Sequence, residues 1–190
     1  MIKDKIFLAR RGKYSHLEAI SLISKYGVAK VIGINKESII EEFVRFDKMP
    51  LTINQLARLA KQIHANKRNN LSLVHGDFSS NNTTLFLGVP RCYDYEHAHF
   101  GNIYVDIGRV ILRDCNSLQE VEYFFKEYRG DVPSMEELIS GLIVFCDWQN
   151  KLRVEKNAPY QEVPLVRKAR LKRAPKDITS IINSFKEEVK

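Results

Sequence analysis

The 190-residue chain has little that would cross-link it or anchor it in a membrane. Its three cysteines are odd in number, far apart and without a CxxC pair, so neither a disulfide framework nor a zinc knuckle is indicated. No apolar run approaches the roughly 20 residues that a membrane-spanning helix requires, and the N-terminus lacks the apolar core of a signal peptide. Because 44% of the residues are nevertheless hydrophobic, we expect a folded cytoplasmic protein with a real core.

Positive charge is distributed unevenly along the chain. The formal net charge is +7, and residues 151–190 hold 11 Lys and Arg against 5 Asp and Glu. The densest part of this tail contains Arg167, Lys168, Arg170, Lys172 and Arg173. Such a cluster could neutralise phosphates of RNA or meet an acidic protein partner. A solvated, partly helical arm is an equally good interpretation.

Four polar side chains lie among the short apolar runs of residues 73–109: Asp77, Asn82, Asp94 and Asp106. A hairpin between Asn82 and Asp94 could bring the first three together. Phosphoryl transfer needs a carboxylate that accepts the proton of the acceptor hydroxyl, and hard oxygen ligands for Mg²⁺ on the nucleotide phosphates. Asp77 fits the first role, and Asn82 and Asp94 fit the second. Alone, each would more often be a turn or capping residue, so the order of all four carries the hypothesis.

At these residues the chain resembles the kinase-like phosphotransferases that include choline and ethanolamine kinases and aminoglycoside phosphotransferases. The matching segments are His75-Gly76-Asp77 with Asn82, Asp94-Tyr95-Glu96 and Asp106-Ile107-Gly108. The resemblance implies that Asp77 is the catalytic base and that Asn82 and Asp94 bind Mg²⁺ and through it ATP. It also implies that His75 and Asp106 support the catalytic loop. Glu96 would assist a second ion or cap a turn.

The first 48 residues are expected to form a small sheet with one helix. The pattern predicts strands over residues 3–10, 28–34 and 38–46 and a helix over residues 14–25. This arrangement resembles an abbreviated kinase N-terminal lobe. On that resemblance, Glu18 pairs with a phosphate-binding lysine, and Glu42 and Val44 belong to the hinge whose backbone contacts adenine.

The same segment departs from the family at its beginning. Only about 13 residues precede the expected helix, and Gly12 is the only glycine before Gly27, so no glycine-rich phosphate loop is encoded. Lys5, Arg10 and Lys13 are imperfect candidates for the lysine. Because the backbone N–H groups of such a loop normally cover the triphosphate, we expect weak nucleotide affinity, a lid supplied by a partner, or loss of activity.

The rest of the chain reads as mostly helical. Capping boxes at Thr52/Gln55 and Ser134/Glu137 predict two helix starts, the first opening a helix over about residues 53–65. Further elements are expected as a hairpin over residues 83–94 and helices over residues 103–113 and 118–128. The sequence thus predicts an α+β, protein-kinase-like fold: a reduced N-terminal β-sheet lobe (1–48), a mostly helical C-terminal lobe (49–150) and a basic tail (151–190).

Several other side chains have two interpretations each. His64 is expected to be a packed structural residue and Trp148 a packing anchor. The aromatic group at Tyr123, Phe124, Phe125 and Tyr128 could line an acceptor pocket but is more typical of core. His97 and His99 could bind a metal, although a surface turn is the favoured interpretation.

Three functions compete at this point. The leading hypothesis is an ATP-dependent phosphotransferase that acts on a hydroxyl of a small molecule. The second is a compact atypical protein kinase or ATPase, similar to the RIO kinases or the small kinase of the KEOPS complex, working on an RNA or protein partner through the basic tail. The third, motivated by the missing phosphate loop, is a pseudokinase binding module that no longer catalyses.

Overall fold

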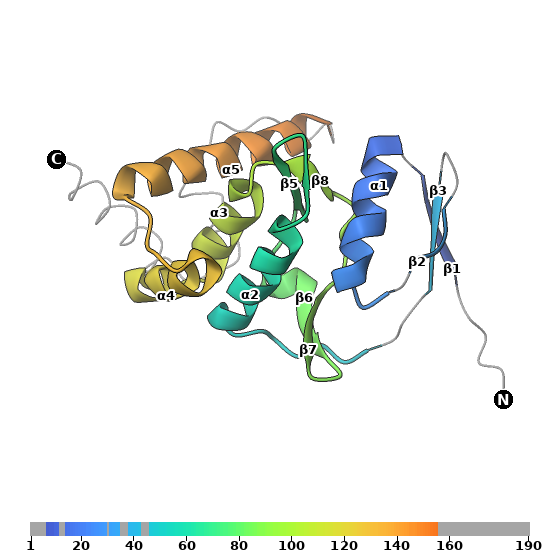
Figure 1. Ribbon diagram of the computed structural model, residues 1–190, viewed down its shortest axis with the longest axis horizontal. Helices are drawn as coiled ribbons and strands as arrows, with labels where there is room; N and C mark the ends of the chain where they lie inside the picture. Colours follow the sequence, from blue (N-terminus) through green and yellow to red (C-terminus); the bar gives the residue numbers. More distant parts are fainter. Residues whose placement is uncertain (1–6, 12–13, 30, 35–37, 43–45, 156–190) are drawn as a thin grey trace.

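The computed structural model describes residues 7–11, 14–29, 31–34, 38–42 and 46–155, and mixes helices with small sheets (Figure 1). The first elements are β1 (Phe7–Arg11), α1 (Tyr14–Ile23), the 3₁₀ turn η1 (Ser24–Tyr26), β2 (Val31–Ile34) and β3 (Ser38–Glu42). They are followed by α2 (Ile53–His64), β4 (Lys67–Arg68), β5 (Leu71–Val74), η2 (Ser80–Asn82), β6 (Thr83–Phe86) and β7 (Val89–Cys92). The remaining elements are β8 (His99–Gly101), α3 (Tyr104–Arg113), α4 (Leu118–Arg129) and α5 (Met135–Glu155).

The small N-terminal sheet has the order β1-β3-β2, with both neighbours of β3 antiparallel to it. Helix α1 lies between this sheet and the rest of the molecule (Figure 1). The predicted helix and strands of this region are therefore present, within the residues that the structure describes. Lys5 and Lys13 lie outside those residues, whereas Arg10 pairs with Ile39 in the sheet.

A second sheet, with the order β4-β5-β8, was not predicted from the sequence. Its strands are only two to four residues long, too short for a clear alternation of apolar and polar residues. Asn69 and Asn70 join β4 to β5 with φ values of 48° and 63°, the left-handed conformation that asparagine tolerates in tight hairpin turns. The predicted hairpin around β6 and β7 is confirmed, with Thr83 opposite Cys92.

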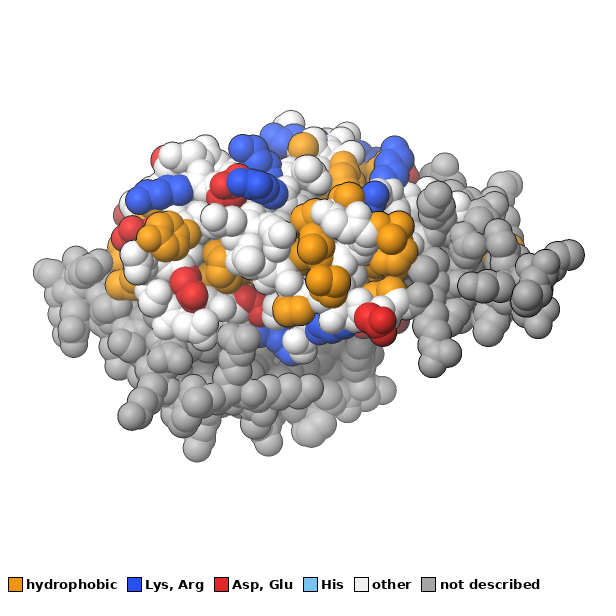
Figure 2. All heavy atoms as spheres, turned by 90° about the horizontal axis from the view of Figure 1, so that it is seen from below, with side chains coloured by type: hydrophobic (Ala, Val, Ile, Leu, Met, Phe, Trp, Pro, Cys, Tyr) orange, Lys and Arg blue, Asp and Glu red, His pale blue; other side chains and the backbone are white. Residues whose placement is uncertain are grey.

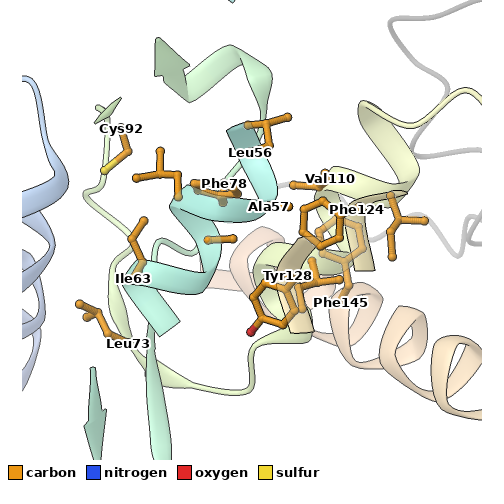
Figure 3. Close-up of a cluster of buried hydrophobic side chains, with 14 of the residues drawn as sticks. Leu56, Ala57, Ile63, Leu73, Phe78, Cys92, Val110, Phe124, Tyr128 and Phe145 are labelled. Carbon is orange, nitrogen blue, oxygen red and sulfur yellow. The ribbon is translucent and has the colours of Figure 1, made fainter. Parts of the chain in front are cut away.

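The hydrophobic core lies where α2 packs against α4 and α3 packs against α5. Figure 3 shows apolar side chains of α2, α3, α4 and α5 meeting there, together with Phe78 from the loop after β5. Phe124, Phe125 and Tyr128 are buried, which confirms the core interpretation for them. Tyr123 is 48% exposed and its hydroxyl accepts a hydrogen bond from Gln119.

The two predicted capping boxes have different outcomes. At the start of α2, both expected hydrogen bonds form: the Gln55 N–H donates to Thr52 Oγ1, and the Thr52 N–H donates to Gln55 Oε1. At the start of α5, Ser134 Oγ accepts the Glu137 N–H, but the Glu137 carboxylate binds Arg129 and Tyr104 instead of the backbone. A charged partner on a neighbouring helix therefore displaces the local contact that the spacing predicted.

Backbone contacts join the N-terminal segment to the β6–β7 hairpin. The Val28 N–H donates to the Cys92 carbonyl at 3.0 Å, and Arg91 Nη1 donates to the Lys25 carbonyl at 2.7 Å. Glu18 of α1 forms an ion pair with Arg68 at the end of β4. The small sheet is thus attached through α1, η1 and their immediate neighbours.

Exposed hydrophobic side chains lie at the tip of the β6–β7 hairpin and in the linker beside it. Leu87 is 87% exposed, Val89 47% and Met49 54%. The linker runs along β6, since the Met49 N–H donates to Thr84 Oγ1 and the Met49 carbonyl accepts the Leu85 N–H, both at 2.9 Å. Figure 2 views the molecule from this side and shows orange side chains grouped near the middle of the face.

Two other expectations concern membranes and thiols. Among the described residues, no helix is both long enough and apolar enough to span a bilayer. Cys92 and Cys115 are buried, as expected of core thiols, and burial raises the pKa of Cys92 far above its usual range. The side chain of Cys146 lies outside the described residues.

Candidate phosphoryl-transfer site

The loop after β5 is folded tightly enough to bring Asp77 and Asn82 together. Phe78 and Ser79, which follow Asp77, are fully buried. Ser79 then caps the 3₁₀ turn η2, with its side chain accepting the Asn81 N–H, and Thr83 Oγ1 donates back to the Ser79 carbonyl. The five-residue spacing from Asp77 to Asn82 is therefore closed by one helical turn.

Asn82 contacts Asp77 through its amide nitrogen. Asn82 Nδ2 donates to Asp77 Oδ2 at 2.8 Å and to the Asp77 carbonyl at 2.9 Å. Both hydrogen bonds use the nitrogen, which leaves the amide oxygen as the end suited to ligate a cation. Asn82 is 9% exposed, so this orientation is held in a largely buried setting.

The β6–β7 hairpin brings Asp94 next to the same turn. The Tyr93 N–H donates to the Asn82 carbonyl at 2.9 Å, one step beyond the Thr83–Cys92 pair. Asp94 follows at once, exposed and with φ of 57°, a left-handed conformation that is uncommon for residues other than glycine, and in which aspartate is enriched. The hairpin thus places the two proposed metal ligands at its open end.

His75 is buried between the loop and the residues that follow β7. Its Nδ1 accepts the Asp77 N–H at 3.3 Å, and its Nε2 lies 3.0 Å from the Tyr93 carbonyl. This pattern requires a neutral ring protonated on Nε2. Burial lowers the pKa of His75, against the opposing effects of Asp106, Asp77 and Asp94. His75 thus contacts the backbone of Asp77 and that of Tyr93, the residue before Asp94.

Asp106, in the first turn of α3, holds the loop from beneath and is fully buried. Its Oδ2 accepts the His75 N–H at 2.7 Å and its Oδ1 accepts the Gly76 N–H at 2.9 Å. His64 Nε2 lies 3.1 Å from Oδ2. Burial alone would raise the pKa of Asp106, but the His64 hydrogen bond and the nearby imidazoles bring it below its usual value. The packed structural role expected for His64 matches this position, since its other nitrogen meets Tyr128.

Helix α3 contacts the loop at two further points that sequence reasoning missed. Arg109 forms an ion pair with Asp77 Oδ1, and Asp114 accepts hydrogen bonds from the Ser80 N–H at 2.9 Å and from Ser80 Oγ at 2.5 Å. Together with Asp106, these contacts hold the loop at three points: residues 75–76, residue 77 and residue 80. A signal was available, because Asp106 and Arg109 are three apart and share one helix face.

Helix α5 also reaches the loop. Trp148 Nε1 donates to the Gly76 carbonyl at 3.0 Å, and its ring stacks on His99 with centroids 4.2 Å apart. Trp148 was expected only to pack. Gly76 has φ of +81°, and a Cβ there would lie 2.3 Å from the His97 carbonyl oxygen. The backbone of the loop is therefore fixed on both sides, and only glycine fits at residue 76.

The other predicted site residues lie elsewhere or outside the described residues. Glu18 forms an ion pair with Arg68 of β4. Glu42 ends β3 opposite Phe7. Val44 and the basic residues of the tail lie outside the described residues.

Glu96 and the two histidines lie between β7 and the start of β8. Glu96 Oε1 lies 3.4 Å from His97 Nε2, and His99 Nδ1 lies 2.9 Å from the His97 carbonyl. Across the part of the chain that the structure describes, no three His, Cys, Asp or Glu side chains are grouped to hold an ion. His97 lies in the turn before β8, whereas His99 begins β8.

The side chains of Asn82 and Asp94 fit a cation whose remaining ligands come from a bound substrate. One amide oxygen and one carboxylate are too few for a protein-only site, but they match Mg²⁺, which usually binds through one or two protein groups plus substrate phosphates. The chemistry of Asn82 and Asp94 thus fits MgATP. Among the described residues, no glycine-rich segment lies on the N-terminal side to cover the phosphates.

Comparison with known proteins supports the fold. No family model and no curated protein matches the sequence. Among solved structures, the chain is similar to an ethanolamine kinase from Plasmodium vivax, with a TM-score of 0.54 and 15% sequence identity over 97% of this chain and 79% of that chain. This likeness shows a fold of the kinase-like kind. The predicted reduction of the N-terminal lobe and the boundaries at residues 48 and 151 stay predictions; α5 runs on to Glu155.

Proposed function

We propose that the chain is an ATP-dependent phosphotransferase that transfers a phosphoryl group to a hydroxyl of a small molecule, within a kinase-like fold whose N-terminal lobe is reduced. The observation that supports this most is the contact between Asn82 Nδ2 and Asp77 Oδ2. This hydrogen bond joins the proposed base to a proposed metal ligand, and it leaves the Asn82 amide oxygen as the atom that would bind Mg²⁺. The fold likeness to an ethanolamine kinase agrees with this class of reaction.

In the proposed reaction, Asp77 orients the acceptor hydroxyl and takes up its proton. The acceptor oxygen forms a bond to the γ-phosphorus of ATP while the bond to the bridging oxygen breaks, and ADP leaves with that electron pair. Bound Mg²⁺ would neutralise charge on the phosphates. Asp106 and Trp148 keep the loop in place by binding its N–H and carbonyl groups, so the Asp77 backbone is positioned before substrate binds.

A turnover assay tests this proposal. We expect the chain to transfer the γ-phosphoryl group of radiolabelled ATP to hydroxyl acceptors, and Asp77→Asn to lower the rate by about 10²- to 10⁴-fold, the usual contribution of a positioned base. The control is Asp131→Asn, because Asp131 is 70% exposed and pairs only with Arg129 among the described residues. Equal rates for wild type and Asp77→Asn would refute the assigned role.

The same assay separates the competing functions. A pseudokinase binding module would bind nucleotide or partner without any turnover that depends on Asp77. A kinase or ATPase working on an RNA or protein partner would require the basic tail, so removal of residues 165–190 would abolish partner binding while leaving nucleotide hydrolysis intact. For the small-molecule phosphotransferase, this truncation leaves the rate with a soluble acceptor unchanged.

A further inference from the structure

The guanidinium group of Arg109 is unusually placed for a charged side chain. It is 16% exposed, yet its one ion pair among the described residues is with Asp77. Its Nε is buried and has no hydrogen-bond partner there. A guanidinium has five N–H donors, and leaving a buried donor unpaired is unfavourable. Such a cost is expected at functional sites, where a ligand completes the set.

A second guanidinium lies one helical turn further along α3. Arg113 is four residues from Arg109, which puts both on one face. Both side chains are half-buried, and burial lowers the pKa of Arg109. In the described part of the chain, no carboxylate pairs with Arg113 at ion-pair distance. Arg113 thus lies on the same face of α3 as Arg109, and Arg109 pairs with Asp77.

The nearby carboxylates are already used by the protein. Asp106 binds two backbone N–H groups and His64, and Asp114 binds Ser80. Asp77 is shared between Asn82 on Oδ2 and Arg109 on Oδ1. Beside Arg109, an ammonium group on the acceptor would thus find Asp77, Asp106 and Asp114 already engaged, and it would face two positive charges. An oxyanion would meet donors in the planar, paired geometry that guanidinium groups offer.

Resting on the proposed function, we infer that the acceptor is an oxyanion-bearing polyol, such as a sugar phosphate or sugar acid, whose anionic group binds between Arg109 and Arg113. The two carboxylate oxygens of Asp77 face different partners, so the anionic group and the nucleotide would bind on different sides of Asp77. Asn82, the metal ligand, holds Oδ2, whereas Arg109 holds Oδ1. The chain would therefore differ in acceptor charge from the ethanolamine kinase whose fold it shares.

A matched set of acceptors tests the inference on the full chain. Glucose 6-phosphate, glucuronate, glucose and glucosamine share a hydroxyl framework and differ in charge. We expect kcat/KM to be at least about tenfold higher for an anionic member than for glucosamine, and the two anions distinguish phosphate from carboxylate. We also expect Arg113→Gln to raise KM for the preferred anion about tenfold, with Arg113→Lys intermediate because it keeps the charge but not the fork. The control is Lys126→Gln, an exposed charge on α4.

The outcomes are separable. Equal or better use of glucosamine would overturn the inference and leave the proposed function standing. A preference for the anion that survives in Arg113→Gln would also overturn it. If Arg113→Gln instead weakened binding of a non-hydrolysable MgATP analogue, measured by calorimetry, the oxyanion would be the nucleotide's own phosphate and the inference would be wrong. No turnover of ATP with any acceptor would remove the proposed function and the inference together.

Discussion

The loop from His75 to Asn82 and the small sheet of β1, β3 and β2 are held in very different ways. The loop is bound by the buried carboxylates of Asp106 in α3 and Asp114 at its end, and by Trp148 of α5. The small sheet is connected to the rest through α1 and η1, by the Glu18–Arg68 pair and a few backbone hydrogen bonds. Both of these side chains are more than a third exposed.

This difference suggests that the two halves of the proposed reaction are built separately. The base lies in a loop whose backbone is hydrogen-bonded to the buried side chains of Asp106 and His75. The side that would cover the nucleotide depends on contacts near the surface, which are individually weak. Changes in the loop should therefore act on stability and turnover, and changes in the small sheet mainly on nucleotide affinity. The predictions below test that contrast, beginning with the largest effect.

Replacing Asp106 by asparagine should be the most damaging single change. The fully buried carboxylate serves two backbone N–H groups and His64, and an amide cannot accept from all three. Breaking such a buried charged network costs about 3–5 kcal/mol, which urea unfolding would measure. Asp131→Asn, on the surface, should cost at most about 1 kcal/mol. Equal costs for the two variants would show that the loop is not held by Asp106.

Two glycines with similar backbones test the tight fit of the loop. Gly76 and Gly88 have φ of +81° and +78°, but a Cβ would collide with the His97 carbonyl at residue 76 and meet nothing within 4 Å at residue 88. Gly88→Ala should therefore lower the free energy of unfolding by only about 1–2 kcal/mol, the strain of a left-handed backbone with a Cβ. Gly76→Ala should cost clearly more, by thermal or urea unfolding, and lower kcat as well. Similar losses for both would mean that the space around residue 76 is not confining.

His75 should make stability depend on pH. Burial lowers its pKa, so the folded protein keeps it neutral, whereas the unfolded chain takes up a proton below about pH 6.5. The unfolded state then binds more protons, and the unfolding free energy should fall by about 1 kcal/mol between pH 7 and 5.5. Above pH 7 this contribution is fully present. In His75→Gln the decrease should be smaller, and an unchanged pH profile would show that His75 titrates normally.

The smallest effect on stability is expected at the Glu18–Arg68 pair. Because both side chains are partly exposed, Arg68→Gln should change the unfolding free energy by at most about 1 kcal/mol. Its effect on the affinity for a non-hydrolysable MgATP analogue should be relatively larger, since Glu18 belongs to the helix beside the small sheet. A loss of stability as large as that of Asp106→Asn would remove the contrast between the two regions.

Much of this arrangement could be predicted from the sequence because its signals are local. The Thr52 capping box, the apolar stripe of α2 and the order of Asp77, Asn82, Asp94 and Asp106 all act over short distances. The partners from distant helices could not be predicted in this way. Trp148 donates a hydrogen bond to Gly76, 72 residues away in sequence, and the Glu137 carboxylate binds Arg129 and not the backbone of its own helix. Such contacts depend on how helices pack, which no local pattern specifies.

The central claim is that Asp77, Asn82 and Asp94 meet at one magnesium–nucleotide complex, and calorimetric titration of a non-hydrolysable ATP analogue tests it most directly. With Mg²⁺ present, we expect Asp94→Asn to weaken binding at least about tenfold, and Asp77→Asn to leave it within a few-fold of wild type. Without Mg²⁺, all three proteins should bind equally weakly. Identical Mg²⁺-dependent binding by wild type and Asp94→Asn would contradict the account.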